Sequence, residues 1–358
     1  MNVEQRHGGN RAAMARSLGC SAAGLLDASA SLVPWTAMPL GLRWLSWRDY
    51  PDRHQRRLRA SIAALHGLDW QAVLPGNGAA ELFTWAARDA ASAGLNRLPA
   101  PGFADYSRAL RCWNGRMAES ALTLAWSEAF PQPYADCGVG DVVWICNPHN
   151  PTSQLWSRAS LETLLSQFAL VICDEAFLPL VPDGEQQSLI PLVPHHPNLV
   201  VIRSLTKLYG IAGLRLGYAV AHPERLQRWA EWRDPWPLNG VALAVGERLL
   251  ASPRRYRRWC KRVQRWTATE GAWMQQQLAA LPGITPMPSA ANFLLIRAEQ
   301  SLVPLREAVE QRHRILLRDC RSFTGLGENW LRIGLQSPRN NRRIVRALRQ
   351  ELQRNPLG

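Results

Sequence analysis

The stretch Leu199-Val-Val-Ile-Arg-Ser-Leu-Thr-Lys-Leu-Tyr-Gly-Ile-Ala-Gly-Leu-Arg-Leu-Gly-Tyr218 decides the fold of this chain. It begins with an apolar run that is typical of a buried β-strand. The run leads directly into a loop rich in hydroxyl groups and glycine that holds one lysine, Lys207. Apolar runs of the same kind occur at 142–146 and 169–173, and the pattern at 160–168 between them predicts a helix. This alternation predicts an α/β domain with a mostly parallel sheet.

Lysine is nearly absent from the rest of the chain. Of the 42 basic residues, two are lysine, Lys207 and Lys261, and all the others are arginine. Lys261 stands in the cationic run 254–262, which is typical of a solvated helix face. Lys207 instead follows a buried strand. Because a partly buried lysine can lose its proton and form a Schiff base, which arginine cannot do, this placement indicates a cofactor site.

The length of 358 residues exceeds what a single hydrophobic core usually serves, so two domains are expected. Residues 1–40 form an arm rich in Arg, Gly, Ser and Pro, which is predicted to join the smaller domain. The larger domain is expected over 41–240. A long helix at 256–281, three short strands at 292–296, 315–318 and 330–335, and a closing helix from 338 to about 353 are predicted. Together they indicate a smaller α+β domain over 241–358.

Composition and charge exclude several classes of protein. Seven cysteines without a C-x-x-C pair and eight histidines without metal-ligand spacing favour a reducing cytoplasm and argue against disulfides or a metal site. No apolar run is long enough for a signal peptide or a membrane span. The net charge of +14 includes basic runs at 53–59, 254–265 and 339–349, each spaced like a solvated helix face. Nucleic acid and membrane are therefore not expected as partners, and the positive field suits an anionic substrate.

Four segments carry polar groups at the ends of predicted strands, where α/β sheets bind ligands. The first is a glycine turn that opens a helix, Gly76-Asn-Gly-Ala-Ala-Glu81; the second is a Pro/Asn turn at 147–152; the third is Asp174-Glu-Ala-Phe177. The fourth is the lysine loop, which contains three further donors: Ser204, Thr206 and Arg215. Such donors suit a phosphate, and a buried Asp suits a protonated ring nitrogen. Simple helix or turn capping is the alternative interpretation of the first and third segments.

The order of these elements (glycine turn, N-P-x-N-P-T, D-E-A-F, S-x-T-K, G-L-R) resembles the aspartate-aminotransferase superfamily of pyridoxal-phosphate enzymes, fold type I. The resemblance covers most of the chain. It implies pyridoxal 5'-phosphate as cofactor, a large domain with a mostly parallel seven-stranded sheet, and a small α+β C-terminal domain.

The same resemblance assigns roles around the cofactor ring. Lys207 matches the Schiff-base lysine, and Asp174 matches the partner of the pyridine nitrogen. Asn150 matches the asparagine that bonds the ring hydroxyl. Tyr106, in Pro101-Gly-Phe-Ala-Asp-Tyr106, matches the aromatic residue that stacks on the ring.

The phosphate and the substrate carboxylate have matching residues as well. Tyr50 matches a tyrosine that reaches the cofactor phosphate of the neighbouring subunit, which implies a homodimer with shared active sites. Arg332, in Trp330-Leu-Arg-Ile-Gly334, matches the arginine that binds the α-carboxylate. The cofactor phosphate is assigned to Gly78, Ala79, Ser204, Thr206 and Arg215.

Within the superfamily the chain looks closest to the threonine-phosphate decarboxylases of cobalamin biosynthesis, and next to the histidinol-phosphate aminotransferases. Three stretches resemble the decarboxylases. They are His7-Gly-Gly-Asn10, the run 174–185, and the run 317–326. The second of these has Phe177 where the aminotransferases carry a tyrosine.

Residues for the substrate phosphate follow from these stretches. His7, Asn10 and Arg321 are the predicted clamp, with a disordered tail and a surface charge as the plainer interpretation. The segment 27–34 departs from the decarboxylase pattern, because Ser31 and Val33 replace two asparagines. Ser31 is still expected to contact substrate.

Three functions remain open on the sequence. The first is decarboxylation of L-threonine O-3-phosphate to (R)-1-amino-2-propanol O-2-phosphate. The second is an aminotransferase of the histidinol-phosphate type, acting on a phosphorylated or aromatic amino acid. The third is a binding protein without catalysis, against which Lys207 and Asp174 argue.

Overall fold

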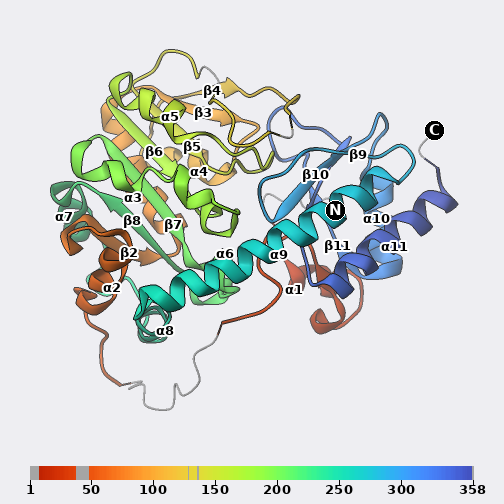
Figure 1. Cartoon of the computed structure of the whole chain (residues 1–358), viewed down its shortest axis with the longest axis horizontal. Helices are drawn as coiled ribbons and strands as arrows, with labels where there is room; N and C mark the ends of the chain where they lie inside the picture. The colour runs from red at the N-terminus through yellow and green to blue at the C-terminus, as the bar shows by residue number, and fades with distance from the viewer. Residues whose placement is uncertain (1–7, 38–47, 128, 135–136, 357–358) are drawn as a thin grey trace.

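A seven-stranded sheet forms the centre of the larger part of the molecule (Figure 1). The computed structural model describes residues 8–37, 48–127, 129–134 and 137–356. The strand order is β2-β8-β7-β6-β5-β3-β4, and β8 is antiparallel to both of its neighbours while the other pairs are parallel. The predicted mostly parallel sheet is thus confirmed. Its strands are β2 (Val73–Asn77), β3 (Asn96–Ala100), β4 (Met117–Ala121), β5 (Val142–Cys146), β6 (Leu170–Asp174), β7 (Leu199–Ser204) and β8 (Leu216–Ala221).

Helices cover both faces of this sheet, which explains why its central strands are apolar throughout. The helices are α2 (Arg56–His66), α3 (Ala79–Ala93), α4 (Ala104–Arg111), α5 (Arg158–Glu162), α6 (Leu205–Tyr209), α7 (Pro223–Trp232) and α8 (Gly240–Leu250). The sequence predicted one helix over 160–168. The structure has α5 followed by a 3₁₀ turn at Thr163–Ser166 instead.

A smaller antiparallel sheet lies beside the large one, with the order β12-β13-β10-β9. Its strands are β9 (Thr285–Pro286), β10 (Phe293–Arg297), β12 (Arg318–Asp319) and β13 (Trp330–Gly334). The predicted single strand at 315–318 is divided, because Ile315–Leu316 forms β11 and pairs elsewhere. Helices α10 (Val303–His313) and α11 (Pro338–Arg354) pack together beside this sheet.

One long helix, α9 (Pro253–Ala279), runs from the large sheet to the small one (Figure 1). It begins three residues before the predicted start at 256, because Ser252 caps its first turn by accepting a hydrogen bond from the backbone of Arg255. Leu281 and Ile284, just beyond its end, remain in the core.

The N-terminal arm contains regular structure that the sequence analysis did not predict. It includes helix α1 (Arg11–Ser17) and the short strand β1 (Leu26–Asp27), which pairs in parallel with β11. The backbone N–H of Gly334 also donates to Ala28 O, at 2.7 Å. These contacts place residues 26–31 against the small sheet.

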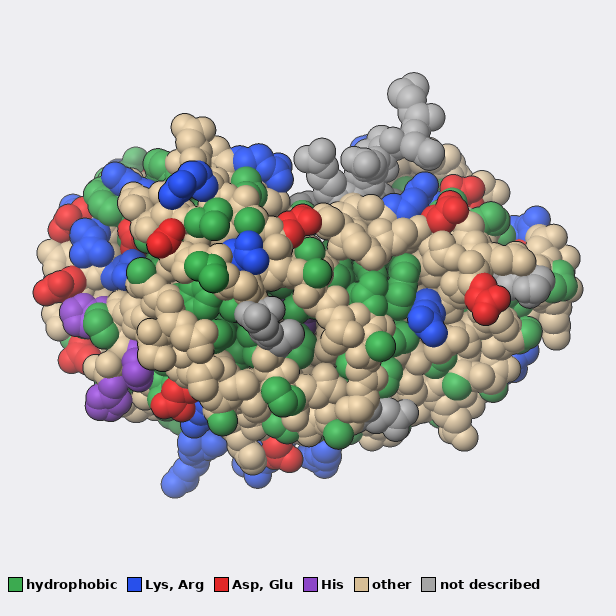
Figure 2. Space-filling view, turned by 90° about the horizontal axis from the view of Figure 1, so that it is seen from above, with side chains coloured by type: hydrophobic (Ala, Val, Ile, Leu, Met, Phe, Trp, Pro, Cys, Tyr) green, Lys and Arg blue, Asp and Glu red, His purple; other side chains and the backbone are tan. Residues whose placement is uncertain are grey.

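In the described part of the chain, no helix is long and apolar enough to cross a membrane. Within the same residues, no cluster of His, Cys, Asp and Glu is arranged to hold a metal ion. On the face seen in Figure 2, basic and acidic side chains lie interspersed.

Candidate active site

A cavity of about 450 Å³ lies where the carboxyl ends of the central strands face the arm and the small sheet. Asp174 ends β6, Ser204 ends β7, and Asn150 follows β5. Arg318 and Arg332 enter the cavity from β12 and β13. Strands of the large sheet and segments of the small one therefore contribute to one site.

Lys207 lies on the short helix α6 and lines the cavity. Burial lowers the pKa of Lys207 to about 8; the positive charge of Arg332 acts in the same direction, and Asp174 opposes it. Its Nζ lies 5.6 Å from the centre of the Phe177 ring. A lysine with this pKa is partly neutral near physiological pH and is thus a competent nucleophile toward an aldehyde.

Asp174 is held by two short hydrogen bonds and a longer one from Cys146 Sγ at 4.0 Å. Its Oδ1 accepts the backbone N–H of Ala176 at 2.9 Å, and its Oδ2 accepts the hydroxyl of Tyr106 at 2.7 Å. Burial raises the pKa of Asp174 to about 6, although these two hydrogen bonds and the charge of Lys207 act in the opposite direction. A cationic ring nitrogen in the cavity would complement this carboxylate.

Tyr106 does not occupy the position predicted for it. Its side chain is buried in the core, with ring centres 5.2 Å from both Phe83 and Trp144, and it does not line the cavity. Phe103 lines the cavity instead. Phe103 immediately precedes α4, whereas Tyr106 lies nearly one turn further on and faces the sheet. We therefore propose Phe103, and not Tyr106, as the residue that stacks on the ring, while Tyr106 donates a hydrogen bond to Asp174.

The five residues predicted for the cofactor phosphate all line the cavity. Gly78 (φ 76°) precedes the 15-residue helix α3, whose N-terminus presents backbone N–H groups and a positive dipole end. The hydroxyls of Ser204 and Thr206 lie 2.7 Å apart. A Cβ at Gly78 would come within 2.7 Å of Arg215 Nη2. This arrangement of hydroxyl, guanidinium and N–H donors around one glycine fits a phosphate dianion.

Arg332 is buried and forms no salt bridge with any carboxylate in the described ranges. It donates to Asn150 Oδ1 and, at 3.1 Å, to Ser29 O, while its Nε has no partner there. Burial lowers the pKa of Arg332 to about 10, and the charge of Arg318 contributes. Ser31 also lines the cavity, and its hydroxyl likewise lacks a partner in the described structure.

Arg321 was predicted as part of the substrate clamp, but the structure places it outside this cavity. Its guanidinium pairs with Asp319, with the shortest contact at 2.6 Å, and it lines a separate cavity of about 510 Å³ beside α4. Arg318 lines the active-site cavity instead. Arg318 lies directly opposite Arg332 in the pairing of β12 with β13, so both side chains project to the same face of the small sheet.

The remaining predicted residues lie apart from the cavity or outside the description. His7 lies outside the described residues, whereas Gly8 lines the cavity. Asn10 is exposed and precedes α1, away from the cavity lining. Tyr50 is 77% exposed and stacks on Trp236 at 4.3 Å, so it contributes nothing to the cavity of its own chain.

Comparison with known proteins defines the class. Residues 45–348 match the family model "Aminotransferase class I and II", and the chain belongs to that family. It is 34% identical to threonine-phosphate decarboxylase of Salmonella typhimurium, covering 97% of this chain and 96% of the relative. It is 32% identical to histidinol-phosphate aminotransferase of Symbiobacterium thermophilum, covering 85% and 82%. Histidinol-phosphate aminotransferase of Sinorhizobium meliloti in complex with pyridoxal-5'-phosphate superposes with a TM-score of 0.81 at 19% identity, covering 97% and 95%.

The chain is therefore a pyridoxal-phosphate-dependent enzyme of fold type I. The residues in the cavity fit that cofactor, because Lys207 supplies a nucleophile, Asp174 a buried carboxylate and the glycine turn a phosphate cradle. Two residues of this site were missed by the sequence analysis, Phe103 and Arg318. Phe103 lies three residues before the predicted Tyr106, and Arg318 lies three residues before the predicted Arg321. Both belong to stretches that the sequence analysis had already singled out.

Proposed function

We propose that this enzyme decarboxylates L-threonine O-3-phosphate to (R)-1-amino-2-propanol O-2-phosphate, a reaction of cobalamin biosynthesis. The observation that carries the proposal is the pair Arg318 and Arg332, opposite each other on β12 and β13 and both buried at one cavity. Arg318 donates to Asp319 O at 2.6 Å and to Ser322 Oγ at 2.7 Å, but these partners are neutral, and its charge still lowers the pKa of Arg332. An anion bound between the two guanidinium groups would offset this repulsion. A substrate with both a carboxylate and a phosphate supplies two such anions.

The two arginines divide the substrate between them in this proposal. Arg332, which contacts Asn150 beside the expected cofactor ring, takes the carboxylate. Arg318 takes the phosphate, together with Ser31 and the backbone near Gly8 at the same cavity. Holding both ends of a small substrate fixes the rotation about its Cα bonds. That rotation would decide which of the bonds to Cα breaks.

The chemistry then depends on a small set of side chains. When bound, pyridoxal phosphate would supply an electron sink for the bond that breaks. Asp174 stabilises positive charge on the ring nitrogen, and Tyr106 keeps the carboxylate oriented by donating to its Oδ2. Lys207 would hold the cofactor before substrate arrives, and its Nζ would afterwards serve to return a proton to the substrate Cα.

The proposal includes a homodimer in which each subunit contributes to the active site of the other. Tyr50 is exposed and does not line the cavity of its own chain, so it is free to contact the site of a partner subunit. A large exposed aromatic side chain is also typical of an interface residue.

An aminotransferase acting on histidinol phosphate or a similar amino acid is the second candidate. The 32% identity to a histidinol-phosphate aminotransferase supports it. Phe177 favours the decarboxylase, because it is the residue of the decarboxylase pattern and places an apolar ring, without a hydroxyl, 5.6 Å from Lys207 Nζ. The greater coverage of the decarboxylase relative, 97% of this chain, acts in the same direction.

One incubation separates the two candidates. The holoenzyme is mixed with L-threonine O-3-phosphate, with and without 2-oxoglutarate, and carbon dioxide and keto acids are measured. The proposal expects carbon dioxide and aminopropanol phosphate in both mixtures, with unphosphorylated threonine a poor substrate. Formation of a keto acid that requires 2-oxoglutarate would replace the decarboxylase with the aminotransferase.

A further inference from the structure

A buried ion cluster lies directly behind the cofactor site. It consists of Arg203, Glu175 and Glu185, and is called the ion cluster below. The Arg203 guanidinium is 1% exposed and contacts Glu175 Oε2 at 2.6 Å. It also makes two parallel contacts with the carboxylate of Glu185, at 2.8 and 3.0 Å. The side chains of Arg203 and Glu175 are buried, whereas that of Glu185 is 39% exposed. Burying charges costs free energy, so the cluster needs its complete set of partners.

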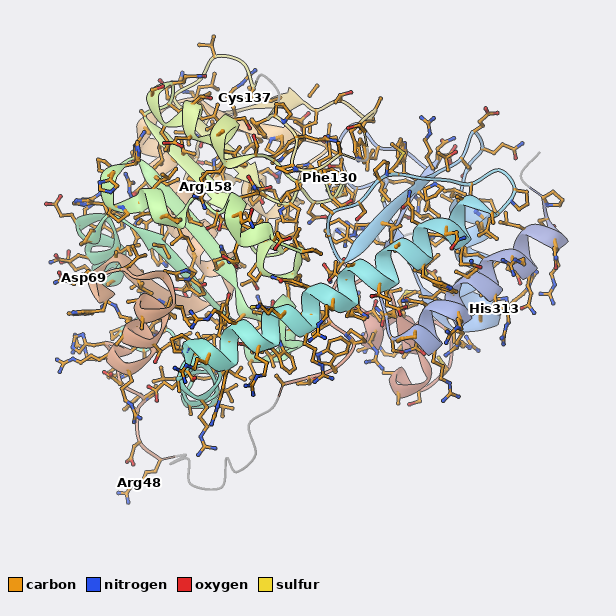
Figure 3. The ribbon with its side chains drawn as sticks, viewed as in Figure 1. Arg48, Asp69, Phe130, Cys137, Arg158 and His313 are labelled. Carbon is orange, nitrogen blue, oxygen red and sulfur yellow. The ribbon has the colours of Figure 1, made fainter. Side chains whose placement is uncertain are left out.

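Those partners are present. Glu175 also accepts the hydroxyl of Ser188 at 2.8 Å and the backbone N–H of Leu189 at 2.7 Å. Arg203 donates to the same Ser188 hydroxyl at 2.9 Å. Arg158, labelled in Figure 3, holds the turn from α5, because its backbone N–H donates to the side chain of Gln187 at 2.8 Å. The ion cluster thus joins the ends of β6 and β7 to the turn at 184–188.

The position of the cluster along the chain connects it to the cofactor. Glu175 directly follows Asp174, and Arg203 directly precedes Ser204. Neighbouring residues of an extended strand project to opposite faces of the sheet. Arg203 lies on the same face of the sheet as Val201 and as Tyr218, its partner on β8. Ile202 belongs to the core on the opposite face. The cluster therefore lies on one face, while Ser204 and Asp174 reach the cavity from the other.

Backbone hydrogen bonds connect the ion cluster directly to the residues that line the cavity. The N–H of Glu175 donates to Ile202 O at 2.9 Å, which continues the β6–β7 ladder by one residue to the edge of the cavity. A displacement of Arg203 relative to Glu175 would change the distance between the residue that faces the ring nitrogen and the residues that face the phosphate.

We propose that Arg203, Glu175 and Glu185 are positioning residues for the cofactor, which set the spacing between Asp174 and the loop from Ser204 to Lys207. The proposal rests on the pyridoxal-phosphate site and not on the identity of the substrate. Its test accordingly measures cofactor binding. If the enzyme does not decarboxylate threonine phosphate, the proposal about cofactor positioning still stands.

The chain offers a matched control. Arg225 on α7 pairs with Asp89 on α3, both side chains are largely buried, and Asp89 also accepts from Trp229. Asp89 lies ten residues along α3 from Ala79, which is about 15 Å from the phosphate cradle. Arg225→Met thus removes a comparable ion pair from the same part of the molecule without touching the strand ends.

The experiment compares Arg203→Met, Glu175→Gln and Arg225→Met with the parent enzyme. Cofactor is removed, the Tm of each apoprotein is measured, and pyridoxal phosphate is titrated by tryptophan fluorescence. Arg203→Met is expected to raise the cofactor Kd by about tenfold or more, and Glu175→Gln, which keeps the side-chain volume, by roughly threefold or more. Arg225→Met is expected to lower Tm and leave the Kd within about twofold of the parent.

Two results overturn the proposal. One is a cofactor Kd within about twofold of the parent in Arg203→Met and Glu175→Gln. The other is an equal loss of cofactor affinity in Arg225→Met, since that would reflect lower stability alone. If Arg203→Met does not fold, Glu175→Gln decides by the same criterion.

Discussion

The cofactor half and the substrate half of the site are built differently. In the cofactor half, Asp174 accepts two short hydrogen bonds, and the strands that carry it and Ser204 are joined by a complete set of buried partners. In the substrate half, Arg332 has no carboxylate partner in the described structure, and the hydroxyl of Ser31 has none of any kind. We infer that the protein preorganises the cofactor half by itself, whereas the substrate half would be completed by the anions that bind there. Substitutions in the two halves should separate accordingly.

The largest effect is expected at Lys207. Lys207→Arg keeps the positive charge but removes the one lysine that lines the cavity, since Lys261 is exposed. Turnover should therefore fall on the order of 10³-fold or more. Borohydride reduction and peptide mapping of the parent should label residue 207. Lys261, the second lysine, is the internal control, and label there would contradict the assignment.

Asp174→Asn tests the buried carboxylate. A neutral amide does not stabilise a protonated ring nitrogen, so kcat should fall on the order of 10²-fold while much of the cofactor stays bound. Cofactor content by absorbance and steady-state rates check this together. Near-normal turnover would show that the carboxylate does not support the electron sink.

Arg318→Ala tests the substrate half. It should raise KM for threonine phosphate by roughly 10- to 150-fold, the effect of losing about 1.5–3 kcal/mol from a charged hydrogen bond. The cofactor spectrum should not change. Arg321→Ala is the matched control, because Arg321 already pairs with Asp319 outside the cavity, and its KM should remain close to that of the parent. If Arg321→Ala raises KM more than Arg318→Ala does, Arg321 and not Arg318 binds the substrate phosphate.

The pKa of Lys207 predicts a pH dependence for cofactor attachment. Because only the neutral amine attacks the aldehyde, and the pKa is lowered to about 8, the rate of attachment to the apoprotein should rise with pH and level off above 8. Each unit below that value should slow it about tenfold. Stopped-flow absorbance measures the rate. A midpoint near the ordinary lysine value of 10.5 would contradict the burial argument.

The smallest effect is expected at Phe103. Phe103→Leu keeps an apolar side chain but loses aromatic stacking, so cofactor affinity should fall by about 0.5–1.5 kcal/mol, or roughly 2- to 12-fold. Fluorescence titration of the apoprotein measures it. If the affinity is unchanged, Phe103 does not stack on the ring.

The sequence predicted most of the large sheet and most of the cofactor half. The runs at 142–146, 169–173 and 199–203 correspond closely to β5, β6 and β7, because apolar strand patterning is local and both faces of these strands are buried. Helix α1 and the pairing of β1 with β11 were not predicted, since the partners of such short elements lie at the other end of the chain.

By itself, the sequence determined the chemical identity of the site. A lysine retained among so many arginines, an aspartate after a buried strand, and a glycine before a helix are properties of residue type and neighbouring residues. Only the tertiary structure decided that Phe103 and not Tyr106 faces the cavity, and that Arg318 and not Arg321 does so. Both outcomes depend on the direction in which a side chain leaves its helix or strand. They also depend on the carboxylate that it contacts, which is Asp174 for Tyr106 and Asp319 for Arg321. Those contacts bring together segments far apart in the chain, so no local pattern records them.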